Sequence, residues 1–313
     1  AYQIVLLAPD STELVRRFNI IEPGDRLLNI EVPEKWPDDP DDDLASVEET
    51  TPEALDRKSL RLFEDMIIGS RGKCRLLNPS ALHAHTEKRR SGKWTRFSAS
   101  RPLQVENLKL GYRLLVLLEK AQVSETKRGF NMSYDAVTWF DELLPANEKQ
   151  ARRWRKNRRQ TYNGSLRHFL AALAAGQLNQ EGFMVAAPRE GAGGVGSPGV
   201  PGFRSGPAPR FLPKHDPYFI AYPTRNDDVF VLDFPDVIQV IYLREPVETK
   251  YRKFRGVSND AQTSMISLLQ GRTAFDRNGN QLDFAPITTA GYWALRQLSD
   301  LLPLTYSPNL DLP

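Results

Sequence analysis

The chain has 313 residues, of which 40% are hydrophobic and 26% are charged, and its formal net charge is +3. This length allows two domains or one large domain with a buried core, and the composition is that of an ordinary globular protein. No segment approaches the run of about 18 apolar residues that a membrane-spanning helix needs, so no span is expected. The chain begins at Ala1 without a basic and apolar leader, so any export signal is expected to have been removed already.

Cys74 is the only cysteine, which excludes an internal disulfide framework and a cysteine-based zinc site. Between Lys73 and Arg75, we interpret it as a small, buried apolar side chain rather than a reactive thiol. No cofactor and no bound metal are expected.

The N-terminal residues alternate between apolar and polar types, which predicts strands over 2–7, 14–20 and 27–32 separated by turn sequences. Three strands do not close a sandwich, so residues 1–35 are interpreted as part of one. Residues 36–55 combine prolines with many carboxylates and predict an acidic linker. A calcium loop is the alternative for this segment, but it lacks the glycine that such a loop needs.

Residues 56–313 are expected to form one larger, β-rich domain. A helix over about 52–68 comes first, and the most apolar segment, 112–123, predicts a central strand covered on both faces. Further strands are expected at 82–86, 94–99, 103–106, 130–140, 229–233 and 237–243, with a hairpin formed by 264–269 and 272–275.

Two other segments of this domain have distinct compositions. Residues 147–181 are rich in alanine, leucine, arginine and lysine and predict a helical section, broken near Gly164 and Gly176. Residues 189–210 are rich in glycine and proline and predict a long, flexible insertion. A final helix is expected over 290–302, with its tryptophan and leucines facing inward.

The most prominent candidate site is a basic run between Lys149 and Arg159. Spacing places four of its side chains on one helical face, namely Arg152, Arg155, Lys156 and Arg159. Such a face can bind phosphates or other anions, and three interpretations remain open: a solvated structural face, an anionic glycan, lipid or protein partner, or nucleic acid. Nucleic acid is not the expected partner, because the overall charge is small and no recognition motif accompanies the run.

Three smaller constellations favour structural roles. His83 and His85 share one face of a predicted strand but lack further metal ligands nearby in the sequence. Residues 276–280 fit a turn at Asn278–Gly279 better than a calcium loop, because the glycine stands at the fourth position. Ser165 and His168 are neighbours on a helix but show no third orienting group, so no catalytic residue is assigned.

Several stretches carry a resemblance to a known family. These are residues 63–69 with 74–79, 110–113, 153–170 and 291–304. They resemble an uncharacterised family of Bacteroidetes envelope proteins described as carboxypeptidase-like regulatory domain-containing. The resemblance covers about 56–306 and implies that 1–35 are the last strands of a transthyretin-like β-sandwich. It also implies export to the periplasm or the cell surface, and it supplies no catalytic residues.

Together these observations predict a β-rich α+β protein, with a partial transthyretin-like sandwich (1–35), an acidic linker (36–55) and a larger antiparallel-sheet domain (56–313) with a helical insertion. The expected function is that of a non-catalytic binding or structural module of the bacterial cell envelope, with envelope glycan or another envelope protein as partner. The alternatives are an envelope carbohydrate- or peptide-processing hydrolase that uses two carboxylates, and nucleic-acid binding through the basic helix.

Overall fold

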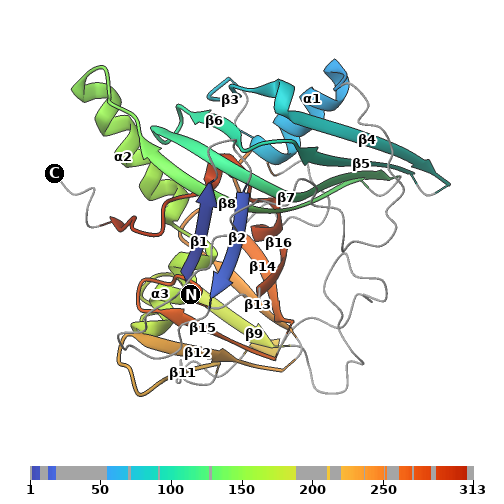
Figure 1. Ribbon diagram of the computed structural model, residues 1–313. Helices are drawn as coiled ribbons and strands as arrows, with labels where there is room; N and C mark the ends of the chain where they lie inside the picture. Colours follow the sequence, from blue (N-terminus) through green and yellow to red (C-terminus); the bar gives the residue numbers. More distant parts are fainter. Residues whose placement is uncertain are drawn as a thin grey trace. The chain divides into compact units, whose positions relative to one another are not determined.

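The computed structural model describes residues 2–7, 13–18, 55–69, 72–90, 92–126, 129–187, 210–211, 220–235, 237–249, 251, 261–269, 271–282 and 287–308. The chain divides into two compact units, Ala1–Glu53 and Ala54–Pro313. In the first unit, strands β1 (Tyr2–Leu7) and β2 (Glu13–Phe18) form an antiparallel hairpin in which Val5 pairs with Val15 (Figure 1). The predicted strand 27–32 and nearly all of the predicted linker lie outside the described residues.

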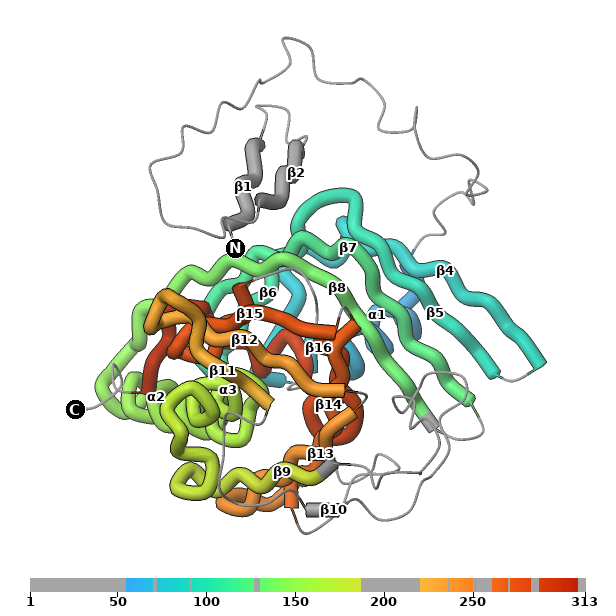
Figure 2. The backbone as a smooth tube through the Cα atoms, turned by 90° about the horizontal axis from the view of Figure 1, so that it is seen from below, coloured from blue at the N-terminus to red at the C-terminus, as the bar shows by residue number. Residues whose placement is uncertain are grey.

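The first sheet of the second unit is built around two long neighbouring strands, β7 and β8 (Figure 2). Strand β7 pairs with β6 through its first half, with β5 through its second half, and with β8 along its other edge. The strands of this antiparallel sheet are β3 (Cys74–Leu76), β4 (Leu82–Arg89), β5 (Gly92–Ala99), β6 (Leu103–Asn107), β7 (Tyr112–Thr126) and β8 (Gly129–Glu142).

The core of this sheet follows from the alternation of side chains along β7. Leu114, Val116 and Leu118 point inward and are buried, as the period of a strand requires. They pack in one cluster with Phe63 and Ile67, which come from helix α1 (Arg57–Phe63) and from the π-helix Glu64–Ile68 that continues it. A helical segment is confirmed over 57–68, while residues 52–54 of the predicted helix lie outside the described residues. The predicted central strand is also confirmed, but one of its faces is only partly covered, because Leu115 and Leu117 are half-buried.

Two smaller sheets make up the rest of the second unit. Their orders are β10-β9-β13-β14-β16 and β11-β12-β15. The strands are β9 (Phe183–Ala187), β10 (Arg210–Phe211), β11 (Ala221–Pro223), β12 (Val229–Asp233), β13 (Val237–Tyr242), β14 (Gln262–Leu268), β15 (Arg272–Asp276) and β16 (Ile287–Gly291).

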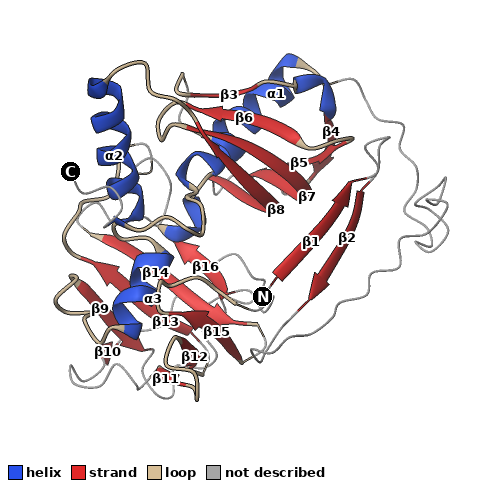
Figure 3. Cartoon of the chain, turned by 60° about the vertical axis from the view of Figure 1, so that its left-hand side comes forward, coloured by secondary structure: helices blue, strands red, loops and turns tan. Residues whose placement is uncertain are grey.

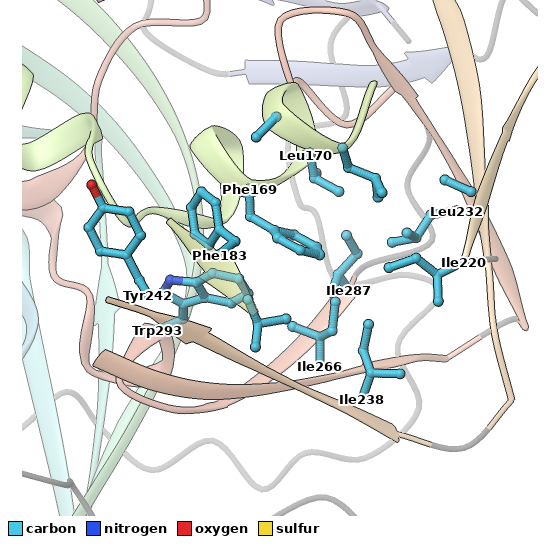
Figure 4. Packing of buried hydrophobic residues seen from close by; sticks show 14 of the residues in the cluster. Phe169, Leu170, Phe183, Ile220, Leu232, Ile238, Tyr242, Ile266, Ile287 and Trp293 are labelled. Carbon is cyan, nitrogen blue, oxygen red and sulfur yellow. The ribbon is translucent and has the colours of Figure 1, made fainter. Parts of the chain in front are cut away.

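The helical section contains α2 (Glu148–Tyr162) and α3 (Leu166–Ala174), separated near Gly164 as predicted. Helix α3 covers a second core: Phe169 and Leu170 point toward Ile266 and Ile287 of the five-stranded sheet (Figure 4). Strands predominate among the described residues (Figure 3), so the predicted β-rich α+β fold is confirmed. No helix among these residues is both long enough and apolar enough to cross a membrane.

Two predicted elements are wrong. The segments 264–269 and 272–275 do form strands, but β14 pairs with β13 and β16, whereas β15 pairs with β12. The short connection between them therefore joins two different sheets instead of closing a hairpin. The predicted helix over 290–302 is replaced by strand β16 and two short 3-10 helices, Trp293–Leu295 and Leu298–Asp300.

The reason for the second difference lies in where the apolar side chains go. Trp293 is buried in the core beneath α3, whereas Leu298 is buried in the core of the first sheet. A continuous helix offers a single apolar stripe, which cannot serve two separate cores. The inward orientation of both side chains is confirmed, while the predicted insertion 189–210 lies, except for Arg210, outside the described residues.

Candidate functional site

The buried face of α2 docks on the turn between β6 and β7. Trp154 Nε1, Asn157 Nδ2 and Arg158 Nε donate hydrogen bonds to the successive backbone carbonyls of residues 108–110, at 2.9, 2.7 and 2.8 Å. These three side chains lie on one face because residues spaced three and four apart are neighbours on a helix. The contacts fix how α2 is rotated and therefore which residues it presents to solvent.

The four predicted site residues line one hollow on the outer side of α2. This hollow, the basic groove, has a volume of about 650 Å³ and is lined by Glu148, Arg152, Arg155, Lys156, Arg159, Gln160 and Asn163. Three of the four cations are exposed, and the Arg155 side chain is 35% exposed. At 1.5 Å per residue, the positions from 152 to 159 extend over roughly 10 Å of the helix.

Positive charge predominates in the basic groove. The one carboxylate among its described lining residues, Glu148, forms ion pairs with Arg155 at 2.8 Å and with Arg152 at 3.4 Å. Exposed pairs of this kind stabilise a protein by about 1 kcal/mol or less, so an incoming anion can replace Glu148 at little cost. The groove is thus able to bind a polyanion.

A second hollow, the aromatic pocket, lies against the same helix and has a volume of about 470 Å³. It is lined by Tyr112, Phe140, Glu142, Pro145, Ala151, Trp154, Arg155, Arg158, Pro303, Thr305 and Tyr306. Arg158 belongs to the basic run in the sequence, yet it is buried here and its guanidinium lies over the Tyr112 ring, 4.2 Å from the centroid. Arg158 stands one helical turn after Trp154, but helical spacing alone did not show that it is buried.

Ser165 and His168 do not form a nucleophile–base pair. The Ser165 hydroxyl caps helix α3 and accepts a hydrogen bond from the His168 backbone N–H at 3.1 Å. The imidazole Nδ1 accepts from the Gly164 backbone N–H, and Nε2 lies 3.3 Å from a carboxylate oxygen of Glu181. These contacts with Gly164 and Glu181 hold the His168 ring in place, so its role is to help pack α3 against the rest of the unit.

Burial lowers the pKa of His168, although Glu181 opposes the shift. A histidine with a lowered folded-state pKa binds its proton more readily in the unfolded chain, so stability is lost as pH falls below about 6.5. We expect the free energy of unfolding, measured with urea, to fall between about pH 7.5 and about pH 5.5 more steeply in the wild type than in His168→Gln. Equal slopes in the two proteins would contradict this role.

The remaining candidates, His83, His85 and Cys74, lie on strands of the first sheet. His83 and His85 lie on β4, opposite Ser98 and Arg96 of β5. Within the described part of the chain, no group of three or more His, Cys, Asp or Glu side chains is placed to hold a metal ion. Cys74 is partly buried, and its thiol donates to Asn107 Oδ1 at 3.2 Å.

The turn at Asn278–Gly279 is present. Backbone N–H groups of this turn donate hydrogen bonds to the Asp276 carboxylate. Asp276 Oδ1 accepts from the backbone N–H groups of Asn278 and Asn280, at 2.9 and 2.8 Å. Gly279 N–H also donates to the Asp276 carbonyl, which closes the turn. These contacts account for the acidic and amide residues of the segment.

A buried charged cluster, which the sequence did not reveal, joins the two cores. The Asp300 side chain is fully buried, and its two oxygens accept from Lys109 Nζ at 2.7 Å and from the Tyr251 hydroxyl at 2.6 Å. Burial, together with Asp300, raises the pKa of Tyr251 well above its usual value, so this tyrosine is a neutral donor. The cluster is a structural connection between residues far apart in the chain.

No protein-family model, no curated protein and no solved structure matches this chain.

Proposed function

We propose that this protein is a non-catalytic binding module of the bacterial cell envelope, and that its basic groove binds an acidic glycan. The observation that carries the proposal is the gathering of Arg152, Arg155, Lys156 and Arg159 in one hollow, whose described lining residues include a single carboxylate, Glu148. The envelope location is supported by the sequence resemblance described above.

The other lining residues favour a glycan over nucleic acid. Gln160 and Asn163 add side-chain amides, which can donate to and accept from sugar hydroxyls. Among the described residues, no aromatic side chain lines the basic groove, whereas proteins that bind single-stranded nucleic acids stack the bases on such rings. Amides beside cations suit a chain of sugars that carry carboxylates.

The carboxylates beside α2 do not favour a glycoside hydrolase. Glycoside hydrolases of the common type need two carboxyl groups that face each other across the bond to be cleaved. Within the part of the chain that the structure describes, Glu148 is the one carboxylate that lines the basic groove, and Glu142 is the one that lines the aromatic pocket. Binding without cleavage is therefore the function that both hollows support best.

The test replaces all four cations of the groove with glutamine and measures affinity for a hexamer of galacturonic acid. Because each exposed ion pair contributes a fraction of a kcal/mol to about 1 kcal/mol, the four changes together are expected to weaken binding by roughly tenfold to a hundredfold. Isothermal titration calorimetry at low salt gives the dissociation constants.

A matched control removes the same charge elsewhere. Lys88, Arg90, Arg101 and Arg225 are exposed and do not line the groove, so replacing them with glutamine should leave the affinity nearly unchanged. Equal losses in the two variants would show that only net charge matters and would overturn the groove assignment. Tighter binding of a DNA duplex than of the hexamer would favour nucleic acid, and shortening of the hexamer would favour a hydrolase.

A further inference from the structure

The aromatic pocket has the size and lining of a site for a small molecule. Its volume of about 470 Å³ lies within the range of about 300–1,000 Å³ that is usual for ligand pockets. It is formed by the start of β7, the end of β8, the inner flank of α2 and the segment that contains Pro303 and Tyr306. Rings and prolines dominate its lining, and three charged side chains take part.

The floor of the pocket carries a fixed positive charge. The Arg158 side chain is 7% exposed, its Nε donates to the Leu110 carbonyl at 2.8 Å, and its guanidinium stacks on Tyr112. A guanidinium held in this way is already oriented, so it can bind a carboxylate with little further loss of conformational freedom.

The carboxylate now paired with Arg158 is replaceable. Glu142 Oε1 lies 2.7 Å from the guanidinium, but the Glu142 side chain is 64% exposed because it stands at the end of β8. A ligand carboxylate can take its position while Glu142 turns into solvent, so that the charge of Arg158 stays compensated throughout.

The aromatic side chains that line the pocket determine which chemical group, besides a carboxylate, the ligand must carry. Tyr112 and Phe140 meet edge to face with their centroids 5.7 Å apart, and Trp154 and Tyr306 also line the space. The C-terminal wall is held in place by Arg167, which donates to the carbonyls of Pro303, Leu304 and Tyr306. Aromatic walls of this kind favour a flat ring with apolar faces.

We propose that the aromatic pocket binds a ring that carries one carboxylate, with the carboxylate at Arg158 and Arg155 and the ring between Tyr112 and Tyr306. This site goes beyond the proposed glycan groove and shares only Arg155 with it. An acidic sugar and an aromatic acid both fit this chemistry, and glucuronate and benzoate serve as the two probes.

The experiment measures dissociation constants for both probes by ligand-observed NMR. Ala151 lines the pocket but not the groove, so Ala151→Leu should fill the pocket and weaken binding by roughly tenfold. Thr305 is exposed at the rim, and Thr305→Tyr provides a second blocking variant that leaves the core untouched. Glu142→Gln removes the competing carboxylate and should tighten binding several-fold, which a loss of stability cannot imitate.

Binding at the two hollows is distinguished by testing substitutions of the groove residues against the ligands of both hollows. Arg152→Gln with Arg159→Gln should weaken the galacturonate hexamer and leave both small probes unchanged, whereas Arg155→Gln should weaken all three. Failure of both probes to bind the wild type, or equal affinity in the wild type and both blocking variants, would overturn the pocket assignment alone. A stronger response to glucuronate would identify the ligand as a sugar acid, and a stronger response to benzoate as an aromatic acid.

Discussion

Replacing Asp300 with alanine is expected to lower the free energy of unfolding by about 3–5 kcal/mol, the cost of removing one partner from a buried ion pair. The Asp300 side chain is fully buried and binds both Lys109 Nζ and the Tyr251 hydroxyl. Burial by itself would lower the pKa of Arg296, but Asp300 contributes to raising it, so Arg296 also depends on this carboxylate. Without Asp300, buried positive charge would lose its compensation.

Urea denaturation provides the measurement, and Asp227→Ala provides the control. Asp227 is exposed, so its removal should change the free energy of unfolding by about 0.5 kcal/mol or less. Asp300→Asn keeps the shape and removes the charge, so most of the loss should remain in this variant. A loss in Asp300→Ala no larger than that of Asp227→Ala would show that the cluster does not stabilise the fold.

Replacing Gly111 with alanine is expected to displace helix α2. Gly111 has a φ of +77°, which costs an alanine about 1–2 kcal/mol. The added Cβ would also overlap the Trp154 ring, and forcing extra atoms into a packed site costs about 1–3 kcal/mol more. Because Trp154 anchors α2, binding at both hollows should weaken together with stability.

Gly72 offers a matched control for this substitution. Its φ is +78°, nearly the same as that of Gly111, but an added Cβ would meet nothing within 4 Å. The difference in unfolding free energy between Gly111→Ala and Gly72→Ala therefore isolates the overlap with Trp154. Equal losses in these two variants, or full binding by Gly111→Ala, would contradict the docking of α2 described above.

Part of the first sheet could be predicted from the sequence, because β4 with β5, β6 with β7 and β7 with β8 pair as neighbours in the chain, whereas β3 with β6 and β5 with β7 do not. Strands β7 and β8 follow one another and pair along their lengths, and the apolar pattern of each segment was sufficient to predict both strands. Strands β14 and β15 are also consecutive and alternate equally well, but they do not pair with each other: β14 pairs with β13 and β16, and β15 pairs with β12. Periodicity identifies a strand and its buried face, and it does not identify which sheet the strand joins.

In the candidate site, too, features set by neighbouring residues in the sequence could be predicted, and features set by distant residues could not. Helical spacing was enough to place Arg152, Lys156 and Arg159 on one exposed face. It could not show that Arg158 turns inward, because its partners are backbone carbonyls of residues 110–111 and a carboxylate at the end of β8. The aromatic pocket likewise depends on Tyr306, which lies far from α2 in the sequence.

The placement of Trp293 and Leu298 has a consequence for the protein as it leaves the ribosome. Each residue fills a different core, and both are translated after every strand and helix that they pack against. Neither core can therefore be completed during synthesis of the preceding segments, and apolar surface of both remains uncovered until this short stretch emerges. The nascent chain therefore exposes apolar surface to misassembly and to chaperones until residues 293–298 have been made.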